Sequence, residues 1–169
     1  PLKYDCASMK GRLAGVGGNP GNLVFMDALK QQVLYNDEID LTFNQFDLLK
    51  DSSVVMPSSN FIRHVKNDDF FTKYSNFIDQ IDGNVTLAGL GAQSSAVFNT
   101  PWKLVKLALN KDQIRFLKKI SEKSVTIGVR GPFTAECLEL LGIRNYRIIG
   151  CPSLFKYLDG VYPDVKKPS

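Results

Sequence analysis

The stretch VTIGVRGPFTAECLELLGI, residues 125–143, places an arginine and a glycine between an apolar run and a helical pattern. The apolar run is typical of a buried strand, and Pro132 predicts a helix that starts directly after it. Arg130 would then stand at a strand end, just before a helix N-terminus. Backbone N–H groups favour an anion there, and a guanidinium can bind phosphate or carboxylate through two hydrogen bonds. The alternative, a structural salt bridge or an arginine that holds backbone carbonyls, stays open.

Four more stretches have the composition of ligand-facing loops: GGNPGN, PSSNFIRH, GLGAQ and GCPSL. They are rich in Gly, Ser, Asn or Pro, which let a backbone approach a ligand closely. The one histidine, His64, lies in the second of them and could act as a general acid or base, although without a partner carboxylate at fixed spacing a surface or capping role is favoured. No G-x-S-x-G motif accompanies Ser94 and Ser95, so a hydrolase triad is not indicated. GVGGNPGN fits neither a dinucleotide fingerprint nor a phosphate-binding P-loop.

The elements that must position these residues alternate along the chain. Apolar strands are predicted within residues 53–60, 84–93, 124–129 and 146–150, and helices within 23–34, 67–81, 110–123 and 131–142. A polar loop is predicted around Pro101 and Trp102. Apolar strands separated by helices predict an α/β fold: a Rossmann-like, doubly wound, mostly parallel sheet with helices on both faces. Because ligands bind beyond the carboxyl ends of such strands, we expect the five stretches to meet at one edge.

Two helix ends are predicted in detail. Asn110 and Gln113 have the spacing of a capping box, and Gly142 is a stop signal for the helix before it. Cys137 falls at a core position of that helix and is expected to be buried.

Composition excludes several classes of protein. With 169 residues, 44% hydrophobic and 22% charged, the chain is expected to be globular, with no transmembrane segment. The net charge of +4 is spread along the chain, and the aromatic residues fall at core spacing, so no nucleic acid is expected as a partner. Three scattered cysteines form neither a zinc site nor a disulfide framework, which favours a cytoplasmic protein without a metal.

Five motifs in order resemble the polysaccharide pyruvyl transferase family: GNLVFMDAL, VVMPSSNFIR, TLAGLGAQ, IGVRGPFTAECLELLGI and RIIGCPSLF. The resemblance covers about residues 18–156, and its last two motifs are the most specific. It implies transfer of a pyruvyl group from phosphoenolpyruvate to a saccharide, as a cyclic ketal, in exopolysaccharide or cell-wall polymer biosynthesis. It also implies a GT-B-like enzyme of two Rossmann-like halves. Residues 1–169 are then expected to be one domain, the N-terminal one of a longer transferase.

The resemblance also implies roles for particular residues. Arg130 matches the family arginine that helps to hold phosphoenolpyruvate, and Gly131 and Thr134 belong to the same motif. Asn60 and Gln93, together with Asn22, carry amide groups suited to sugar hydroxyls, although they can equally cap a loop or, for Asn22, a helix. The general acid is expected in the C-terminal half, so His64 does not inherit that role. No cofactor is implied beyond phosphoenolpyruvate as donor.

Several alternatives stay open at this point. The chain could be a non-catalytic sugar-binding or assembly domain, or a GT-B-type glycosyltransferase that uses a nucleotide-sugar. The saccharide acceptor could be free or lipid-linked, and the protein could lie free in the cytoplasm or at the inner face of the membrane.

Overall fold

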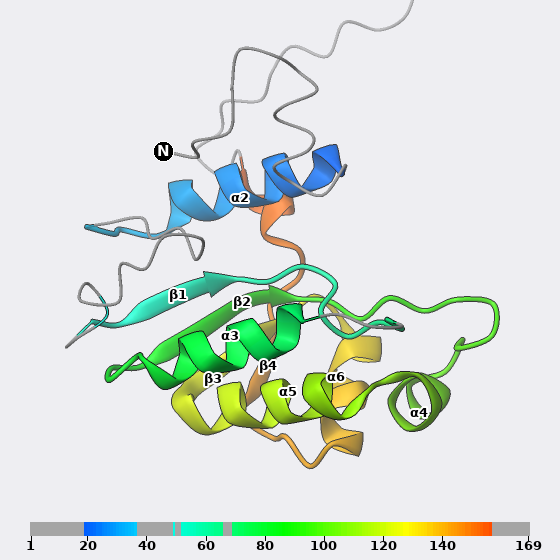
Figure 1. Cartoon of the computed structure of the whole chain (residues 1–169). Coiled ribbons are helices and arrows are strands. Elements are labelled where there is room, and N and C mark those ends of the chain that lie inside the picture. The colour runs from blue at the N-terminus through cyan, green and yellow to red at the C-terminus, as the bar shows by residue number, and fades with distance from the viewer. Residues whose placement is uncertain (1–18, 37–48, 50–51, 66–68, 157–169) are drawn as a thin grey trace, which may run out of the picture. The chain divides into compact units, whose positions relative to one another are not determined.

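The computed structural model describes residues 19–36, 49, 52–65 and 69–156 (Figure 1). The chain divides into two compact units. The first unit contains the described residues between 36 and 150, and the second contains 19–35 and 151–156. The prediction that residues 1–169 form a single N-terminal domain of a longer transferase stays a prediction.

The first unit is built on a four-stranded, all-parallel sheet in the order β1-β2-β3-β4. Its strands are β1 (Val54–Pro57), β2 (Val85–Leu90), β3 (Ser124–Val129) and β4 (Tyr146–Ile148). Its helices are α3 (Phe70–Asp79), α4 (Pro101–Lys103), the π-helix η2 (Leu104–Ala108), α5 (Lys111–Lys123) and α6 (Pro132–Leu140). The predicted α/β, Rossmann-like parallel sheet flanked by helices is therefore confirmed, while the covering of its second face stays a prediction.

Local sequence signals set the ends of the helices. The Asn110 side chain accepts a hydrogen bond from Gln113 N at 2.8 Å, and the Gln113 side chain accepts one from Asn110 N at 3.1 Å, so the predicted capping box of α5 is confirmed. Pro132 is the first residue of α6. Gly142 adopts φ +80°, the left-handed conformation that favours glycine after a helix, as predicted.

The polar loop predicted around Pro101 and Trp102 is wrong, because these residues begin a helical segment. Thr100 caps it: its Oγ1 accepts a hydrogen bond from Lys103 N at 3.3 Å, and Pro101 follows at the first helical position. Three apolar side chains then become buried, and their burial outweighs the polar character of the flanking residues: Leu104, Val105 and Ala108.

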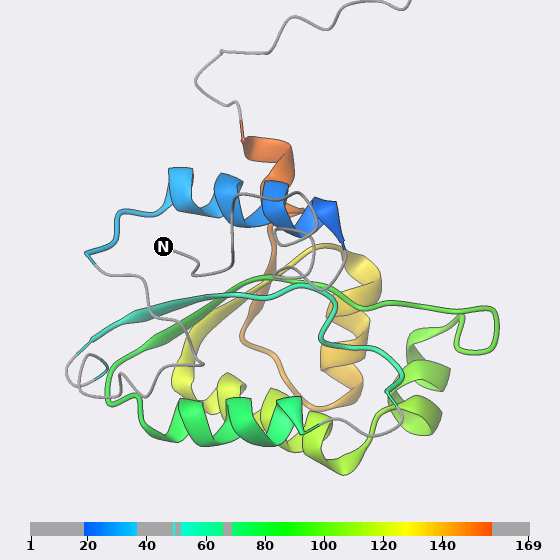
Figure 2. The same ribbon diagram turned by 45° about the horizontal axis from the view of Figure 1, so that its top comes forward.

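α3 and α5 lie side by side along one face of the sheet (Figure 2). Between them, an aromatic cluster comprises Phe61, Phe70, Phe71, Tyr74 and Phe116. At its centre Phe61 makes edge-on ring contacts with the other four, at centroid distances of 5.2–6.2 Å. Because Phe61 follows β1 in the chain, the cluster fixes the loop after β1 onto the helix layer.

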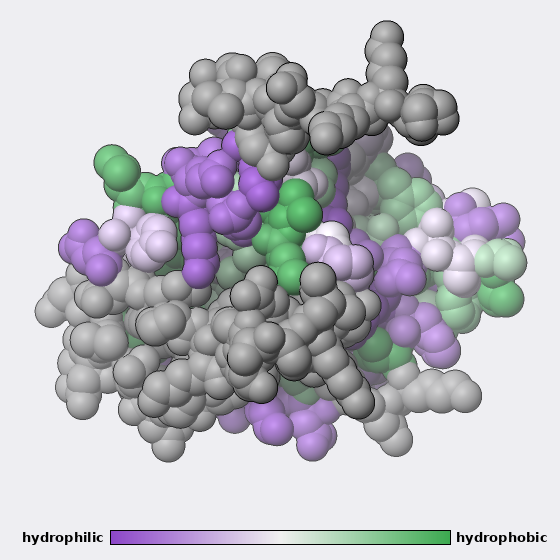
Figure 3. All heavy atoms as spheres, turned by 90° about the horizontal axis from the view of Figure 1, so that it is seen from above, coloured by the Kyte–Doolittle hydropathy of each residue, from purple (hydrophilic) through white to green (hydrophobic). Residues whose placement is uncertain are grey.

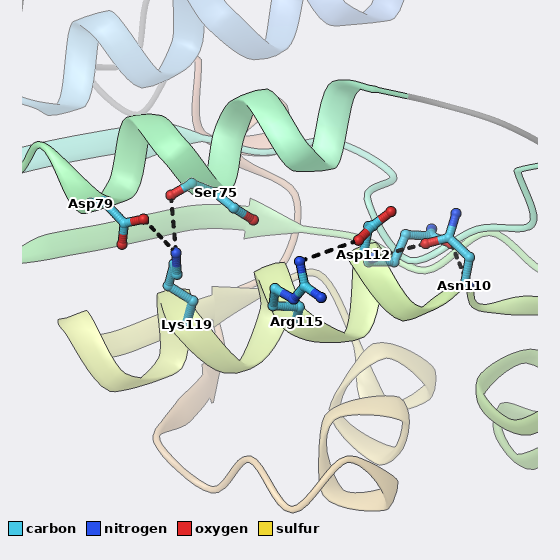
Figure 4. Close-up of polar contacts among 7 residues, drawn as sticks. Ser75, Asp79, Asn110, Asp112, Arg115 and Lys119 are labelled. Atoms are coloured by element: carbon cyan, nitrogen blue, oxygen red, sulfur yellow. Dashed lines mark hydrogen bonds and ion pairs between the residues drawn. The ribbon is translucent and has the colours of Figure 1, made fainter.

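Polar contacts join the same two helices at their exposed rim (Figure 4). Lys119 of α5 reaches α3, where its Nζ lies 2.6 Å from Asp79 Oδ2 and donates to Ser75 O at 3.4 Å. Within α5, Arg115 and Asp112 form a looser pair at 3.6 Å. Such partly solvated pairs contribute roughly 0–1 kcal/mol each, so the aromatic cluster, in which Phe71 and Phe116 are fully buried, contributes more than the rim to holding the helices together.

The second unit contains α2 (Pro20–Gln32) and the 3-10 helix η3 (Pro152–Phe155). Gln32 Nε2 donates to Pro152 O at 3.3 Å, and Lys156 Nζ lies 2.6 Å from Asp27 Oδ2. The two ends of the described chain therefore pack on one another.

The helix-capping alternative for Asn22 is wrong. The N-cap of α2 is Asn19, whose Oδ1 accepts a hydrogen bond from Gly21 N at 2.9 Å, and Asn22 lies within the first turn. Pro20 explains the shift, because proline is favoured at the first helical position and so places the cap one residue before itself.

Candidate functional site

The loops after β1 and β2 run alongside one another at the carboxyl ends of the strands. Gly91 N donates to Ser59 O at 2.9 Å, Ile62 and Ala92 form a parallel bridge, and Gln93 N donates to Ile62 O at 2.8 Å. Figure 1 shows the arrowheads of β1 and β2 pointing to the side on which these loops and α4 lie. The stretches PSSNFIRH and GLGAQ, predicted to share an edge, are thus brought together.

Arg130 lies where β3 ends, and its contacts reach the neighbouring strand β2 and the loop after β1. Its backbone N donates to Leu90 O at 2.9 Å, and its Nε donates to Gly89 O at 2.8 Å. Its Nη1 lies 3.5 Å from Asn60 Oδ1, at the limit of a hydrogen bond. The half-buried guanidinium therefore does hold a backbone carbonyl, one of the readings left open by the sequence. A guanidinium has five N–H donors, so this contact is compatible with binding an anion as well.

Gly91 makes the meeting of Asn60 and Arg130 possible. A Cβ at residue 91 would lie 2.6 Å from Asn60 Oδ1 and 3.2 Å from Arg130 Cδ, so any side chain there would displace both groups. Sequence reasoning marked the stretch GLGAQ but did not single out this glycine. Its signal, a glycine directly after a buried strand, was present.

Gly131 and Thr134 occupy the start of α6 in different ways. Gly131 is the N-cap residue in an extended conformation, φ −175°, and a Cβ built on it would meet no described heavy atom within 4 Å. Thr134 is only 4% exposed, and its Oγ1 accepts a hydrogen bond from Ala92 N at 3.0 Å. Gly131 thus borders open space, whereas Thr134 ties α6 to the loop after β2. The substrate contacts predicted for both stay predictions.

A pocket of about 450 Å³ opens between the same two loops. It is lined by Arg63, His64, Val65, Gln93, Ser94, Ser95 and Phe98. The His64 and Phe98 rings lie 5.2 Å apart at 47°, and the remaining lining is mostly polar. The volume lies within the usual range for small-molecule sites, and ring faces beside hydroxyl, amide and guanidinium groups suit a polyhydroxylated ligand.

The predicted site residues are only partly brought together. Asn60 and Arg130 are in contact, and Gln93 lines the pocket that begins directly beyond Ala92. Asn22 belongs to the second unit, and its predicted sugar contact stays a prediction. Sequence reasoning missed Phe98 as a lining residue, because it does not follow a strand end directly, whereas Arg63 belongs to the predicted ligand-facing stretch PSSNFIRH.

Gln113 holds the loop after β1 that forms one wall of the pocket. This fully buried residue of α5 donates through Nε2 to Phe61 O at 3.3 Å and to Arg63 O at 2.8 Å, in addition to its part in the capping box. The side chain therefore satisfies two carbonyls of the loop that carries Arg63 and His64.

Gln113→Ala is expected to lower the free energy of unfolding by about 2–3 kcal/mol, because it removes a cap contact and leaves the carbonyls of Phe61 and Arg63 without this donor. Urea unfolding monitored by circular dichroism measures this. Ile114→Ala, one residue further along the same helix, is the matched control for lost helix contacts. If Gln113→Ala lost no more free energy of unfolding than Ile114→Ala, Gln113 would not support the loop after β1 as described.

The cysteine in α6 is part of the core. Cys137 is fully buried, as predicted, and burial together with the nearby Glu136 carboxylate raises the pKa of its thiol to about 12. A thiol with so high a pKa is protonated near neutral pH and is a poor nucleophile, which is typical of a structural core cysteine.

The described residues place limits on other kinds of site. Within the ranges that the structure describes, no three His, Cys, Asp or Glu side chains are grouped as a metal site would require. None of the helices in those ranges combines the length and apolar character needed to cross a bilayer.

A family model described as polysaccharide pyruvyl transferase matches residues 19–169. The chain belongs to this family. Polysaccharide pyruvyl transferases are transferases by name, and the matched region includes all five motifs on which the resemblance rested. Neither the curated proteins nor the solved structures gave a match to this chain.

Proposed function

We propose that this protein transfers a pyruvyl group from phosphoenolpyruvate to two hydroxyls of a saccharide, giving a cyclic ketal and inorganic phosphate. The observation that carries the proposal is the position of Arg130. It stands at the carboxyl end of β3, oriented by Gly89 O and close to Asn60, directly before the open space at Gly131.

The donor explains why an arginine suits this position. Phosphoenolpyruvate bears a phosphate and a carboxylate on three carbons, so its site needs directed positive charge, which a guanidinium supplies in a planar fork. The N-terminus of α6 adds a second favourable contribution: Gly131 offers no side-chain cap, and helix N-terminal N–H groups attract anions. Both features would favour a phosphate bound at this strand end.

The chemical steps balance without a cofactor. Protonation of the methylene carbon of phosphoenolpyruvate makes C2 electrophilic, one saccharide hydroxyl adds to C2, and the C2–O bond to phosphate breaks. A second hydroxyl of the same sugar then adds to C2. The two hydroxyl protons replace the proton taken up by the methylene and protonate the departing phosphate. In this scheme Arg130 stabilises the charge that develops on the phosphate as its bond to C2 breaks.

We assign the acceptor to the pocket between the loops after β1 and β2. Gln93, Ser94 and Ser95 offer hydrogen-bonding groups for sugar hydroxyls, and Phe98 offers a ring face for the apolar side of a sugar ring. The acceptor would be a saccharide of an exopolysaccharide or cell-wall precursor, and the cytoplasm would be the compartment.

The experiment that tests the donor is calorimetric titration of phosphoenolpyruvate into the chain, beside UDP-glucose under identical conditions. Binding of phosphoenolpyruvate alone supports pyruvyl transfer. Binding of UDP-glucose alone would favour a nucleotide-sugar glycosyltransferase, and binding of neither by a folded chain counts against a donor site within these residues.

Gly131→Ala is expected to weaken phosphoenolpyruvate binding by about tenfold, equivalent to about 1.4 kcal/mol. The extended backbone accepts alanine, and the added methyl group meets no described atom within 4 Å, so we expect the loss of affinity to come from a clash with the bound donor. Titration of the variant and its thermal unfolding are measured together. Unchanged affinity in a variant of unchanged stability would show that the donor does not lie against Gly131.

A further inference from the structure

The segment that begins at Pro101 presents an outward face with an unusual combination of residues. Its inward side chains belong to the core, whereas Trp102 and Leu107 are 53% and 62% exposed. Lys103 and Lys106 are exposed as well. The two apolar and two basic side chains therefore share the solvent-exposed side of one short helical segment.

The loop after β2 extends this face. Val97, in that loop, is 68% exposed and precedes the helical segment by a few residues. Lys103 Nζ donates to Asn99 Oδ1 at 3.3 Å, so the lysine is directed toward the loop. In Figure 3 hydrophobic and hydrophilic residues lie side by side at the right-hand end of the molecule, where this loop projects in Figure 1. We call Val97, Trp102, Lys103, Lys106 and Leu107 the α4 patch.

Folding explains neither the exposed apolar side chains of the α4 patch nor the lysines between them. A half-exposed tryptophan forgoes much of the stabilisation that burial of its large side chain would give. Two lysines interleaved with exposed Trp, Leu and Val match the surface of proteins that lie in the bilayer interface, where aromatic rings settle at headgroup level and lysines attract anionic lipids. The charge and the apolar groups therefore fit the same partner.

We propose that the α4 patch binds the surface of an anionic lipid bilayer. The apolar side chains enter the interface, and Lys103 and Lys106 contact the phosphate groups of the lipids. The proposal stands on the exposure and charge of the patch and does not depend on pyruvyl transfer. If the proposed function also holds, binding would bring the pocket close to the membrane, because Ser95 and Phe98 lie in the loop that carries Val97. A lipid-linked saccharide would then reach the pocket directly.

The sequence provides a reporter for the test, because Trp102 is the one tryptophan of the chain. The full chain is mixed with vesicles of equal parts phosphatidylcholine and phosphatidylglycerol, or of phosphatidylcholine alone, and tryptophan emission and co-sedimentation are measured. We expect a blue shift of the emission and co-sedimentation with the anionic vesicles. Both should weaken as salt is raised, because salt screens the attraction of exposed charges.

Variants of unchanged fold locate the contact. The double variant K103Q/K106Q is expected to weaken binding about 25-fold, or about fivefold for each lysine close to an anionic surface. The matched control K73Q/K118Q removes two exposed lysines of α3 and α5 and should bind as the parent does. Leu107→Gln should weaken co-sedimentation without altering the unfolding temperature.

Three outcomes would overturn the proposal. The first is absence of binding to anionic vesicles. The second is a loss of vesicle binding in K73Q/K118Q as large as that in K103Q/K106Q, and the third is co-sedimentation with unchanged Trp102 emission. The last would place the membrane contact elsewhere on the chain. Self-association of the chain in sedimentation, lost in Leu107→Gln while vesicles do not bind, would assign the patch to a protein partner.

Discussion

Replacing Arg130 with alanine is expected to reduce pyruvyl transfer by about 10²–10³-fold, the usual effect of removing one group that stabilises developing transition-state charge. The guanidinium is the only part of the side chain that can contact the donor's phosphate, and alanine retains none of its donors. The fold should survive, because Arg130 is half-buried and makes its side-chain contacts near the carboxyl ends of the strands, with Gly89 O of β2 and with Asn60.

The measurement is saccharide-dependent release of phosphate from phosphoenolpyruvate, with titration of phosphoenolpyruvate as a second readout. Arg130→Lys keeps the charge but not the planar fork, so it should recover only part of the activity. Arg115→Ala removes an arginine that is 67% exposed on α5 and serves as the matched control. If Arg130→Ala retained the turnover and the phosphoenolpyruvate affinity of the parent, the proposed role of the guanidinium would be wrong.

Phe116→Ala is expected to lower the free energy of unfolding by about 3–5 kcal/mol, the cost of emptying a buried aromatic site. Phe116 is fully buried, and its ring packs 5.6–6.2 Å from those of Phe61, Phe71 and Tyr74. Because the cluster draws on α3, α5 and the loop after β1, the surrounding residues cannot all move inward to fill the space.

Thermal unfolding should show a fall of about 10 °C in Tm, since 1 kcal/mol corresponds to a few degrees in a domain of this size. Leu107→Ala, at a residue that is 62% exposed, gives the surface control and should change the free energy of unfolding by less than about 0.5 kcal/mol. A loss in Phe116→Ala no larger than that of Phe116→Leu would contradict the account of a rigid aromatic cluster.

Short-range signals made the fold predictable. The capping box of Asn110 and Gln113, Pro132 at a helix start and the left-handed Gly142 each depend on residues only a few positions apart. The parallel sheet followed from apolar strands separated by helices, because such strands must be covered on their faces. The helical segment at Pro101 escaped prediction, since it depends on burial that only the folded chain reveals.

The candidate site was predictable only as an edge of the sheet. Arg130 could be placed there from one strand end. Its contact with Asn60, however, joins residues 70 positions apart and requires that residue 91 has no side chain. The hydrogen bonds from Gln113 to the loop after β1 span about 50 positions, and no local pattern encodes them. Phe98 lines the pocket because of the path of its loop, and that path cannot be predicted from residue spacing.

The hydrogen bond between Ala92 and Thr134 has a consequence for how the pocket can select its ligand. It fixes one end of the loop after β2 to α6, and the Thr100 cap fixes the other end at the start of α4. On this side of the pocket, any adjustment of its width must therefore come from residues 93–99, which are themselves braced by the hydrogen bond from Phe98 N to Ser95 Oγ at 3.1 Å. Acceptor size would be set by the length and composition of that short segment. Relatives that act on different saccharides should accordingly differ there while keeping both anchors.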